Sequence, residues 1–252
     1  NKSPENKLAY QKVTFYRGLE LYTDGKFQEA ATQFENSLDQ QKDAKFTARA
    51  RFWKGETEYV LGDYKNALLS YQQFQGLAAA KETPEYKNRN YNMAYSYFKL
   101  KEYDQAGNYF QNQIDNSKED KIRLNDSYLR LADCRFVTSK YISALEAYNK
   151  VIELKSVDAD YAYFQKAICY GFVSKNDKKI EELNAFLQLY PKSEYRDDAF
   201  FELGNTYVAE NKQDLAIKTY DKLNAEFKNG SFTSKAILRQ GLVYYNADKE
   251  IG

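Results

Sequence analysis

The chain has 252 residues, and its 37 basic and 36 acidic side chains give a formal net charge of +1. Hydrophobic residues make up 43% of it, which is enough for a substantial core and argues against intrinsic disorder. A nucleic-acid surface normally carries a basic excess, so we expect no nucleic-acid partner. No run reaches the roughly 18 apolar residues of a membrane-crossing helix, so we expect no membrane span. With only 11 glycines and 3 prolines, the composition predicts an all-α protein.

Small residues recur at nearly constant intervals along the chain, and each is followed within a helical turn by aromatic or apolar side chains. These small residues are Gly18, Gly55, Ala94, Ala132, Ala167, Gly204 and Gly241. Their successive separations are 37, 39, 38, 35, 37 and 37 residues. A repeat of two helices needs about 34 residues. The period therefore predicts a series of helical hairpins, each made of a helix A, which carries the small residue, and a helix B.

A second pattern marks helix B of each predicted hairpin. An aromatic residue is followed by alanine after three positions and by another aromatic after four more, which places all three on one helix face. The copies are Phe27-Ala30-Phe34, Tyr64-Ala67-Tyr71, Tyr103-Ala106-Phe110, Tyr141-Ala144-Tyr148 and a weaker Gln213-Ala216-Tyr220. We expect the two helices to cross closely at the small residue, with the second aromatic filling the space between stacked hairpins.

This double pattern resembles the tetratricopeptide repeat family over about residues 11 to 247. The best copies are Trp53-Lys54-Gly55 followed by Tyr59, Gly62, Tyr64, Ala67 and Tyr71, and Leu203-Gly204-Asn205-Thr206-Tyr207 followed by Ala216 and Tyr220. The resemblance implies an all-α, right-handed α-α superhelical solenoid of about six and a half helical hairpins, in one domain over 1–252. The expected repeats lie near 11–44, 48–81, 87–120, 125–158, 160–193 and 197–230, with a half-repeat at 234–247.

Two segments depart from the simple pattern. In the fifth repeat Lys179 occupies the alanine position of helix B, and Leu183 replaces the aromatic. We expect this helix to pack more loosely, or the lysine side chain to reach solvent. Thr83-Pro84-Glu85 predicts a helix start, with threonine as the N-cap, proline in the first turn and an acidic side chain beside it.

The residues that most chemistries require are missing. Histidine is absent, which excludes Ser-His-Asp and Cys-His catalysis and every zinc site that contains histidine. Cys134 and Cys169 occupy equivalent positions of two A helices, and we interpret them as small buried residues rather than as a disulfide. Acidic pairs such as Asp197-Asp198 are interpreted as solvated helix faces. We therefore predict no enzymatic activity, no cofactor and no metal site.

The resemblance implies that helices A line a concave groove in which partners bind. The positions expected to face this groove are Tyr22, Phe52, Glu56, Tyr59, Tyr91, Tyr95, Phe98, Asp133, Phe136, Asn205 and Tyr245. Aromatic side chains there would hold an extended peptide or a partner helix, although the alternative is that many pack between neighbouring A helices. Family members that bind C-terminal carboxylates use a clamp of Lys, Asn and Arg. Phe15, Leu19 and Trp53 stand at the matching positions, so this clamp is not expected.

These observations favour a protein–protein interaction scaffold that binds a peptide or a partner protein. The run Tyr190-Pro191-Lys192-Ser193 is similar to repeats of bacterial outer-membrane assembly lipoproteins and of Tol–Pal-associated coordinators, and the Lys, Asn and Tyr content resembles that of Bacteroidetes proteins. We therefore expect part of a larger bacterial envelope-associated protein, periplasmic or at the outer membrane, with the cytoplasm as the alternative. The alternative function is a glycan-binding module whose groove aromatics stack on sugar rings.

Overall fold

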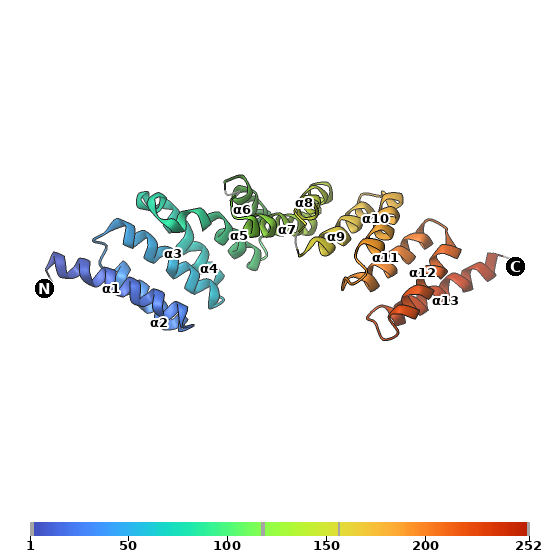
Figure 1. The fold of residues 1–252 in the computed structure, drawn as a ribbon, viewed down its shortest axis with the longest axis horizontal. Coiled ribbons are helices and arrows are strands. Elements are labelled where there is room, and N and C mark those ends of the chain that lie inside the picture. The colour runs from blue at the N-terminus through green and yellow to red at the C-terminus, as the bar shows by residue number, and fades with distance from the viewer. Residues whose placement is uncertain (1–2, 117–118, 156, 251–252) are drawn as a thin grey trace. The chain divides into compact units, whose positions relative to one another are not determined.

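The structure is a computed structural model that describes residues 3–116, 119–155 and 157–250, with side chains up to residue 246. Every regular element in this part of the chain is helical (Figure 1). The predicted all-α architecture of stacked helical hairpins is therefore confirmed.

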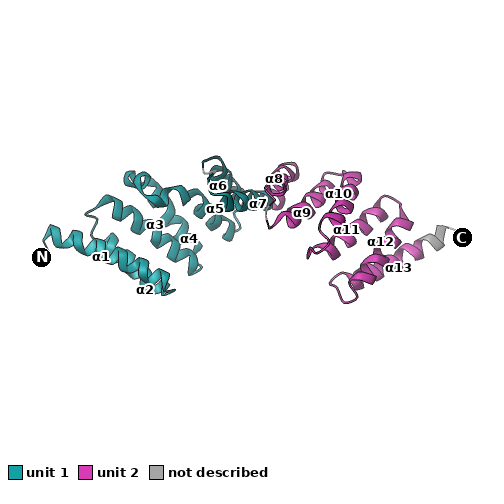
Figure 2. Ribbon diagram, viewed as in Figure 1, with its two compact units in different colours: residues 1–134 teal, residues 135–252 magenta. Residues whose placement is uncertain are grey.

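The chain separates into two compact units, residues 1–134 and 135–252 (Figure 2). Unit 1 contains α1 (Pro4–Thr23), α2 (Phe27–Leu38), α3 (Ala44–Val60), α4 (Tyr64–Gly76), the 3-10 helices η1 (Ala78–Glu82) and η2 (Pro84–Asn88), α5 (Arg89–Lys99), α6 (Tyr103–Asn116) and most of α7 (Lys121–Val137). Unit 2 contains α8 (Tyr141–Glu153), α9 (Ala159–Phe172), α10 (Asn176–Leu189), α11 (Arg196–Ala209), α12 (Gln213–Glu226) and α13 (Thr233–Glu250). The sequence pattern predicted one continuous domain and contains no composition change that marks this division.

Odd-numbered helices are the A helices and even-numbered helices the B helices of the predicted hairpins. Within each unit, a helix A packs against the helix B that follows it, for example α1 on α2 and α11 on α12. The first helix begins at Pro4, several residues before the predicted repeat start. The Ser3 side chain accepts a hydrogen bond from the Asn6 backbone N–H at 3.3 Å, and Pro4 needs no such partner, so this end is capped.

Helix A and helix B cross without room for a side chain at the small residue. A Cβ atom placed on Gly55 would lie 2.8 Å from the ring of Tyr71 on α4. A Cβ atom on Gly204 would lie 2.8 Å from Cδ1 and Cζ of Tyr220 on α12 and closer still to Cε1. Gly241 on α13 meets no atom within 4 Å, because the described chain has no helix B after it. The expected close crossing is confirmed where both helices of a hairpin are present.

Each turn from helix A to helix B contains one residue with left-handed backbone conformation. The turn residues with positive φ are Gly25 (75°), Gly62 (84°), Lys101 (62°), Ser139 (60°), Ser174 (57°) and Asn211 (55°). All six lie seven positions after the small residue of helix A. Glycine adopts this conformation without strain, whereas the other side chains carry a steric cost.

Of the two alternatives expected at Lys179, exposure of its side chain to solvent is wrong. Its side chain is only 12% exposed, and its Nζ lies 2.6 Å from Oε2 of Glu202 on α11. A Cβ on Gly171 would lie 2.9 Å from the Lys179 Cδ atom, so this glycine leaves the space that the lysine methylenes occupy. Leu183, which replaces the usual aromatic, is fully buried. Leu183 and Phe186 are the buried residues of α10, whereas each other described B helix buries four or five, which agrees with the looser packing expected for this helix. Its lysine forms an ion pair with the next hairpin.

A helix begins at Pro84 as predicted, with Glu85 in its first turn, but its type and its cap differ from the prediction. Residues after Thr83 form a short 3-10 helix, and the Thr83 hydroxyl donates to the Ala80 carbonyl oxygen at 2.6 Å instead of capping. Glu85 is buried, and its Oε1 accepts hydrogen bonds from Arg49 Nε at 2.9 Å and from Trp53 Nε1 at 3.0 Å. Its carboxylate thus fixes this segment to α3.

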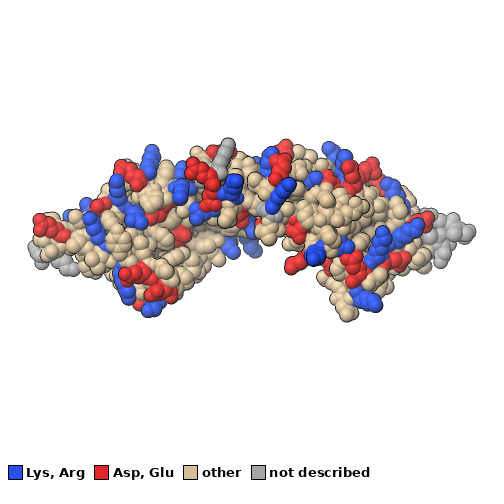
Figure 3. All heavy atoms as spheres, viewed as in Figure 1, with Lys and Arg blue, Asp and Glu red and all other residues tan. Residues whose placement is uncertain are grey.

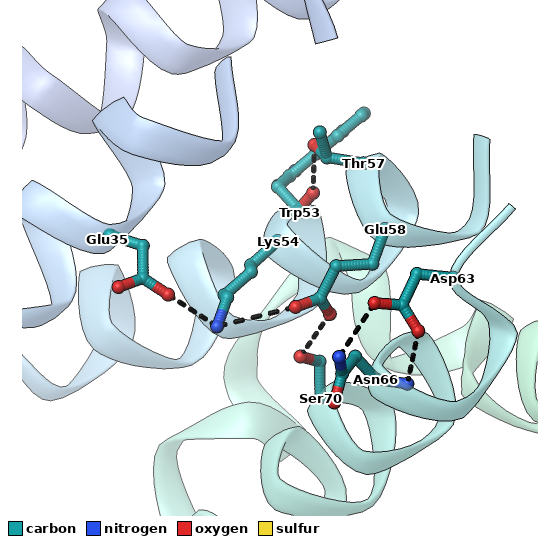
Figure 4. Close-up of polar contacts among 8 residues, drawn as sticks. All are labelled: Glu35, Trp53, Lys54, Thr57, Glu58, Asp63, Asn66 and Ser70. Atoms are coloured by element: carbon teal, nitrogen blue, oxygen red, sulfur yellow. Dashed lines mark hydrogen bonds and ion pairs between the residues drawn. The ribbon is translucent and has the colours of Figure 1, made fainter. Parts of the chain in front are cut away.

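Charged side chains also link neighbouring hairpins of unit 1 at the surface. Lys54 on α3 lies between two carboxylates, with its Nζ 2.5 Å from Glu35 on α2 and 3.4 Å from Glu58 (Figure 4). Glu58 in turn accepts a hydrogen bond from the Ser70 hydroxyl on α4 at 2.6 Å. On the face shown in Figure 3, acidic and basic side chains are interspersed over both units.

Candidate functional site

Unit 1 contains a cavity of about 270 Å³ formed mainly by successive A helices. Its lining residues are Glu56 and Tyr59 of α3, Tyr71 of α4, and Tyr91, Asn92 and Tyr95 of α5. Positions three or four residues apart share one face of a helix, which is why α3 and α5 each present two or more side chains to it. Four of the residues predicted to face a groove, Glu56, Tyr59, Tyr91 and Tyr95, thus lie around one cavity.

Glu56 places a carboxylate in this cavity. Its Oε1 accepts a hydrogen bond from the Tyr71 hydroxyl at 2.6 Å and another from the Asn92 side-chain amide. Burial raises the pKa of Glu56, while these two hydrogen bonds and the charge of Arg123 act in the opposite direction. The same burial, together with the Glu56 charge, raises the pKa of Tyr71 well above its ordinary value.

Tyr91 and Tyr95 are held by an acidic group on α7. Both hydroxyls donate to Oδ2 of Asp126, at 2.9 Å from Tyr91 and 2.6 Å from Tyr95. Arg130 pairs with Asp126 at 3.5 Å and with Asp133 at 3.0 Å, which places the predicted residue Asp133 in this network. Burial and the Asp126 charge raise the pKa of Tyr95 to about 12 and that of Tyr91 further, so both phenols stay protonated.

The rings around the cavity are fixed by edge-to-face packing. The centroids of Tyr91 and Tyr95 are 4.9 Å apart, and Tyr95 lies 5.2 Å from Phe110 on α6. Tyr59 packs at 5.2 Å against Tyr64, the first aromatic of the following helix B. All three pairs are T-shaped, so the ring positions are set before any ligand binds.

Phe52 requires a correction. It was expected to face the groove, but it is 3% exposed and its ring packs 5.7 Å from Tyr71 and 5.2 Å from Phe74. It precedes Gly55 by three residues and therefore lies on the face of α3 that crosses α4. Phe52 belongs to the core.

Three other predicted residues lie outside this cavity. Tyr22 is partly buried and packs edge-on against Trp53 at 5.3 Å, between neighbouring A helices. Phe98 packs against Tyr103 at 5.5 Å at the end of its own hairpin. Tyr245 is 58% exposed on α13. For Tyr22, the alternative of packing between neighbouring A helices is the one observed, whereas Phe98 packs on helix B of its own hairpin.

Unit 2 contains a larger cavity of about 580 Å³, and the predicted residues Phe136 and Asn205 line it. Lys179 and Glu202, the ion pair described above, form part of its wall. Asn205 Oδ1 also accepts a hydrogen bond from the buried Tyr220 hydroxyl at 2.8 Å.

A sequence signal for this second cavity was overlooked. In the first four repeats an aromatic four residues after the small residue packs edge-on against the first aromatic of helix B. These pairs are Tyr22–Phe27, Tyr59–Tyr64, Phe98–Tyr103 and Phe136–Tyr141. The fifth repeat has Gly171 and Asn176 at these two positions, and both line the cavity. The aromatic pair is thus replaced by a glycine and an asparagine, and the Lys179 side chain lies beside Gly171 in the wall of the cavity.

Models of the tetratricopeptide repeat match residues 17–84, 88–120 and 198–230, which together make up more than half of the chain. The chain belongs to the tetratricopeptide repeat family. No curated protein sequence matches it.

Several solved structures share the fold of this tetratricopeptide repeat protein. The crystal structure of MamA has a TM-score of 0.60 at 20% identity, covering 73% of this chain and 93% of that one. YrrB, described as a TPR protein with an unusual peptide-binding site, has a TM-score of 0.60 at 18% identity, covering 81% and 96%. The apo form of RapI has a TM-score of 0.71 at 16% identity, covering 93% and 70%.

The described residues offer little other chemistry. Both cysteines are buried thiols, and burial raises the pKa of Cys134 and of Cys169 to about 12, so neither thiol is ionised at neutral pH. Across the ranges given above, no three His, Cys, Asp or Glu side chains gather as metal ligands. None of the described helices combines the length and the apolarity that crossing a bilayer requires.

Proposed function

We propose that this tetratricopeptide repeat protein is a non-catalytic scaffold that binds a peptide or an extended partner segment along the A helices of unit 1. The observation that carries the proposal is the cavity in which Glu56, Tyr59, Tyr91 and Tyr95 converge from α3 and α5. Tyrosine combines apolar ring area with a polar hydroxyl and is enriched at protein interfaces. Because neighbouring rings fix these side chains, binding loses little side-chain entropy. The description of YrrB as having a peptide-binding site adds support from a protein of similar fold.

The alternative, a glycan-binding module, needs aromatic faces that are open to a sugar ring. The T-shaped pairs formed by Tyr59, Tyr91 and Tyr95 cover part of these faces with the edges of other rings. The hydroxyls of Tyr91 and Tyr95 are also bonded to Asp126. This packing favours a protein ligand over a carbohydrate.

A peptide-display selection on the purified protein, followed by photo-crosslinking, tests the proposal. The crosslinking amino acid benzoylphenylalanine replaces Tyr59 beside the cavity or, as a control, Leu69, which is 49% exposed on the B helix α4. Selected peptides should crosslink from position 59 and not from position 69. Crosslinking from position 69 alone would contradict the proposal. A second pair of results would also contradict it: the selection yields no peptide, and the protein binds a glycan on an array unless Tyr59 is replaced by leucine.

We also propose a location at the bacterial cell envelope, as part of a larger assembly, on the basis of the sequence resemblance alone. Fractionation of the source cells, followed by detection with an antibody to this chain, should find the protein in the periplasmic or outer-membrane fraction. Recovery in the cytosol would contradict this location.

A further inference from the structure

We propose that the cavity of unit 1 binds the ammonium group of a lysine side chain from the partner segment, with Glu56 as its counter-ion. This inference rests on the proposed function and names the chemistry that one side chain of the partner must supply.

The size of the cavity fits a single side chain. Pockets that enclose a whole small-molecule ligand typically measure roughly 300–1,000 Å³. The cavity measures about 270 Å³, and four of its six lining residues are tyrosines. An aliphatic stem would therefore contact ring carbons on entry, while its terminal group reaches the carboxylate of Glu56.

Glu56 has an acceptor to spare for such a group. Its Oε1 already receives hydrogen bonds from Tyr71 and Asn92. Among the described residues, none donates a hydrogen bond to the other oxygen, Oε2. This oxygen is not fully buried, so a group from outside can reach it. A cation from outside would supply the missing hydrogen bond and neutralise a charge that is partly removed from water.

Two arginines of unit 1 contact tyrosines of the cavity, but within the described chain neither pairs with Glu56. Arg130 Nε donates to the Tyr95 hydroxyl oxygen at 3.4 Å, and the Arg123 guanidinium lies 5.5 Å from the centre of the Tyr91 ring. Arg130 pairs with Asp126 and Asp133, at 3.5 and 3.0 Å. Arg123 donates to the Asn88 side chain and lies 3.7 Å from Asp120. The Arg123 charge acts on Glu56 from a distance, but within the described chain it forms no ion pair with that carboxylate. Glu56 therefore has no ion-pair partner within the described chain and is open to a cation from a ligand.

The tyrosines complete a site for a cation. A positive charge near the electron-rich face of a phenol ring is stabilised when it lies within about 6 Å of the ring centre. The hydroxyls of Tyr91 and Tyr95 donate to Asp126. This leaves the Tyr91 oxygen as an acceptor, whereas the Tyr95 oxygen accepts from Arg130 Nε at 3.4 Å. The Tyr91 oxygen is thus an acceptor in the wall of the cavity that also holds Glu56.

The geometry distinguishes lysine from arginine. A guanidinium group binds best to a carboxylate when two parallel N–H groups meet both oxygens. Oε1 of Glu56 is already occupied by two donors, so the second oxygen offers a single contact point. An ammonium group, which acts as a compact charge with freely rotating donors, matches such a point.

The test uses the complete chain and small probes in an NMR titration with isotope-labelled tyrosine. The probes are Nα-acetyl-lysine N-methylamide, the arginine equivalent and the neutral norleucine equivalent. The lysine probe should give saturable shifts of the signals of Tyr59, Tyr91 and Tyr95, with weaker binding of arginine and the weakest binding of norleucine. Norleucine binding equal to that of lysine would overturn the proposal, and so would arginine binding as tight as lysine or the absence of any shift with lysine.

Variants locate the effect at one carboxylate. Glu56→Gln keeps an acceptor for Tyr71 and Asn92 but removes the charge, and it should weaken lysine binding about tenfold or more. Glu58→Gln removes a charge two residues away on the same helix, outside the cavity, and should leave binding unchanged. Tyr59→Leu keeps apolar volume without the ring and should also weaken binding. Equal weakening by Glu56→Gln and Glu58→Gln would overturn the assignment.

This outcome is separable from that of the proposed function. Peptides that crosslink from position 59 with or without a lysine would keep the groove as a binding site and refute the lysine anchor. Peptides that fail to crosslink there would refute both.

Discussion

The substitution of alanine for Gly204 should destabilise unit 2, although alanine favours a helix more than glycine does. The new methyl group would lie 2.8 Å from Cδ1 and Cζ of Tyr220, far inside normal contact distance. Tyr220 is fully buried, and its hydroxyl is fixed to Asn205 at 2.8 Å, so the ring has no free space into which to move. Overpacking of this kind costs about 1–3 kcal/mol. The gain in helix propensity returns about 1 kcal/mol, which leaves a net loss of up to roughly 2 kcal/mol.

Gly241→Ala is the matched control. Gly241 occupies the same repeat position on α13 of the same unit, but a Cβ atom there meets nothing within 4 Å. Only the helix-propensity gain remains, so this variant should be stabilised by up to about 1 kcal/mol. Urea unfolding followed by far-UV circular dichroism measures both changes as shifts of the midpoint at constant slope. Shifts in the same direction for the two variants would refute the close crossing of helices A and B.

Three further predictions follow from the same structure. Lys101→Gly should raise the free energy of unfolding, measured in urea melts, by up to about 1 kcal/mol. The reason is that Lys101 has a φ of 62°, which glycine adopts without strain. An unchanged free energy would contradict this strain. A double-mutant cycle of Lys179→Met and Glu202→Gln should give a coupling energy of about 1 kcal/mol. Water screens this ion pair only in part, because Lys179 is 12% and Glu202 34% exposed. Additive effects of the two substitutions would exclude the ion pair. Because burial raises the pKa of Glu56, the folded state binds its proton more tightly than the unfolded state does, and the stability this provides is lost as the pH rises through that pKa. Glu56→Gln should therefore be more stable relative to the wild type at pH 7 than at pH 4, and an unchanged difference between the two pH values would contradict the burial of this carboxylate.

The repeat pattern was sufficient to predict the helical hairpins and their crossing points. Glycine or alanine at a fixed interval predicts where helix A and helix B of a hairpin approach each other closely. A larger side chain would collide with the ring that packs there, as at Gly55 and Gly204. The longest separation between small residues, from Gly55 to Ala94, coincides with the two 3-10 helices that follow α4. The spacing of the small residues therefore predicts the helices of each hairpin and the length of the segment that joins it to the next.

The direction and partners of individual side chains were less predictable. Phe52 and Glu56 are four residues apart on α3, yet Phe52 packs in the core against Tyr71 and Phe74, whereas Glu56 lines a cavity. The burial of Lys179 depends on Gly171 and Glu202, which come from two other helices. Such contacts depend on how hairpins stack and are not visible in the spacing of one repeat. The division of the chain into two units likewise has no local signature.

The most direct test of the binding account is a crystal structure of the protein with a peptide from the display selection. The account predicts that the peptide lies along α3 and α5 and that a lysine Nζ lies within hydrogen-bond distance of Glu56 Oε2, among Tyr59, Tyr91 and Tyr95. A peptide bound to the B helices, or one bound in the groove with its lysine side chains in solvent, would contradict it.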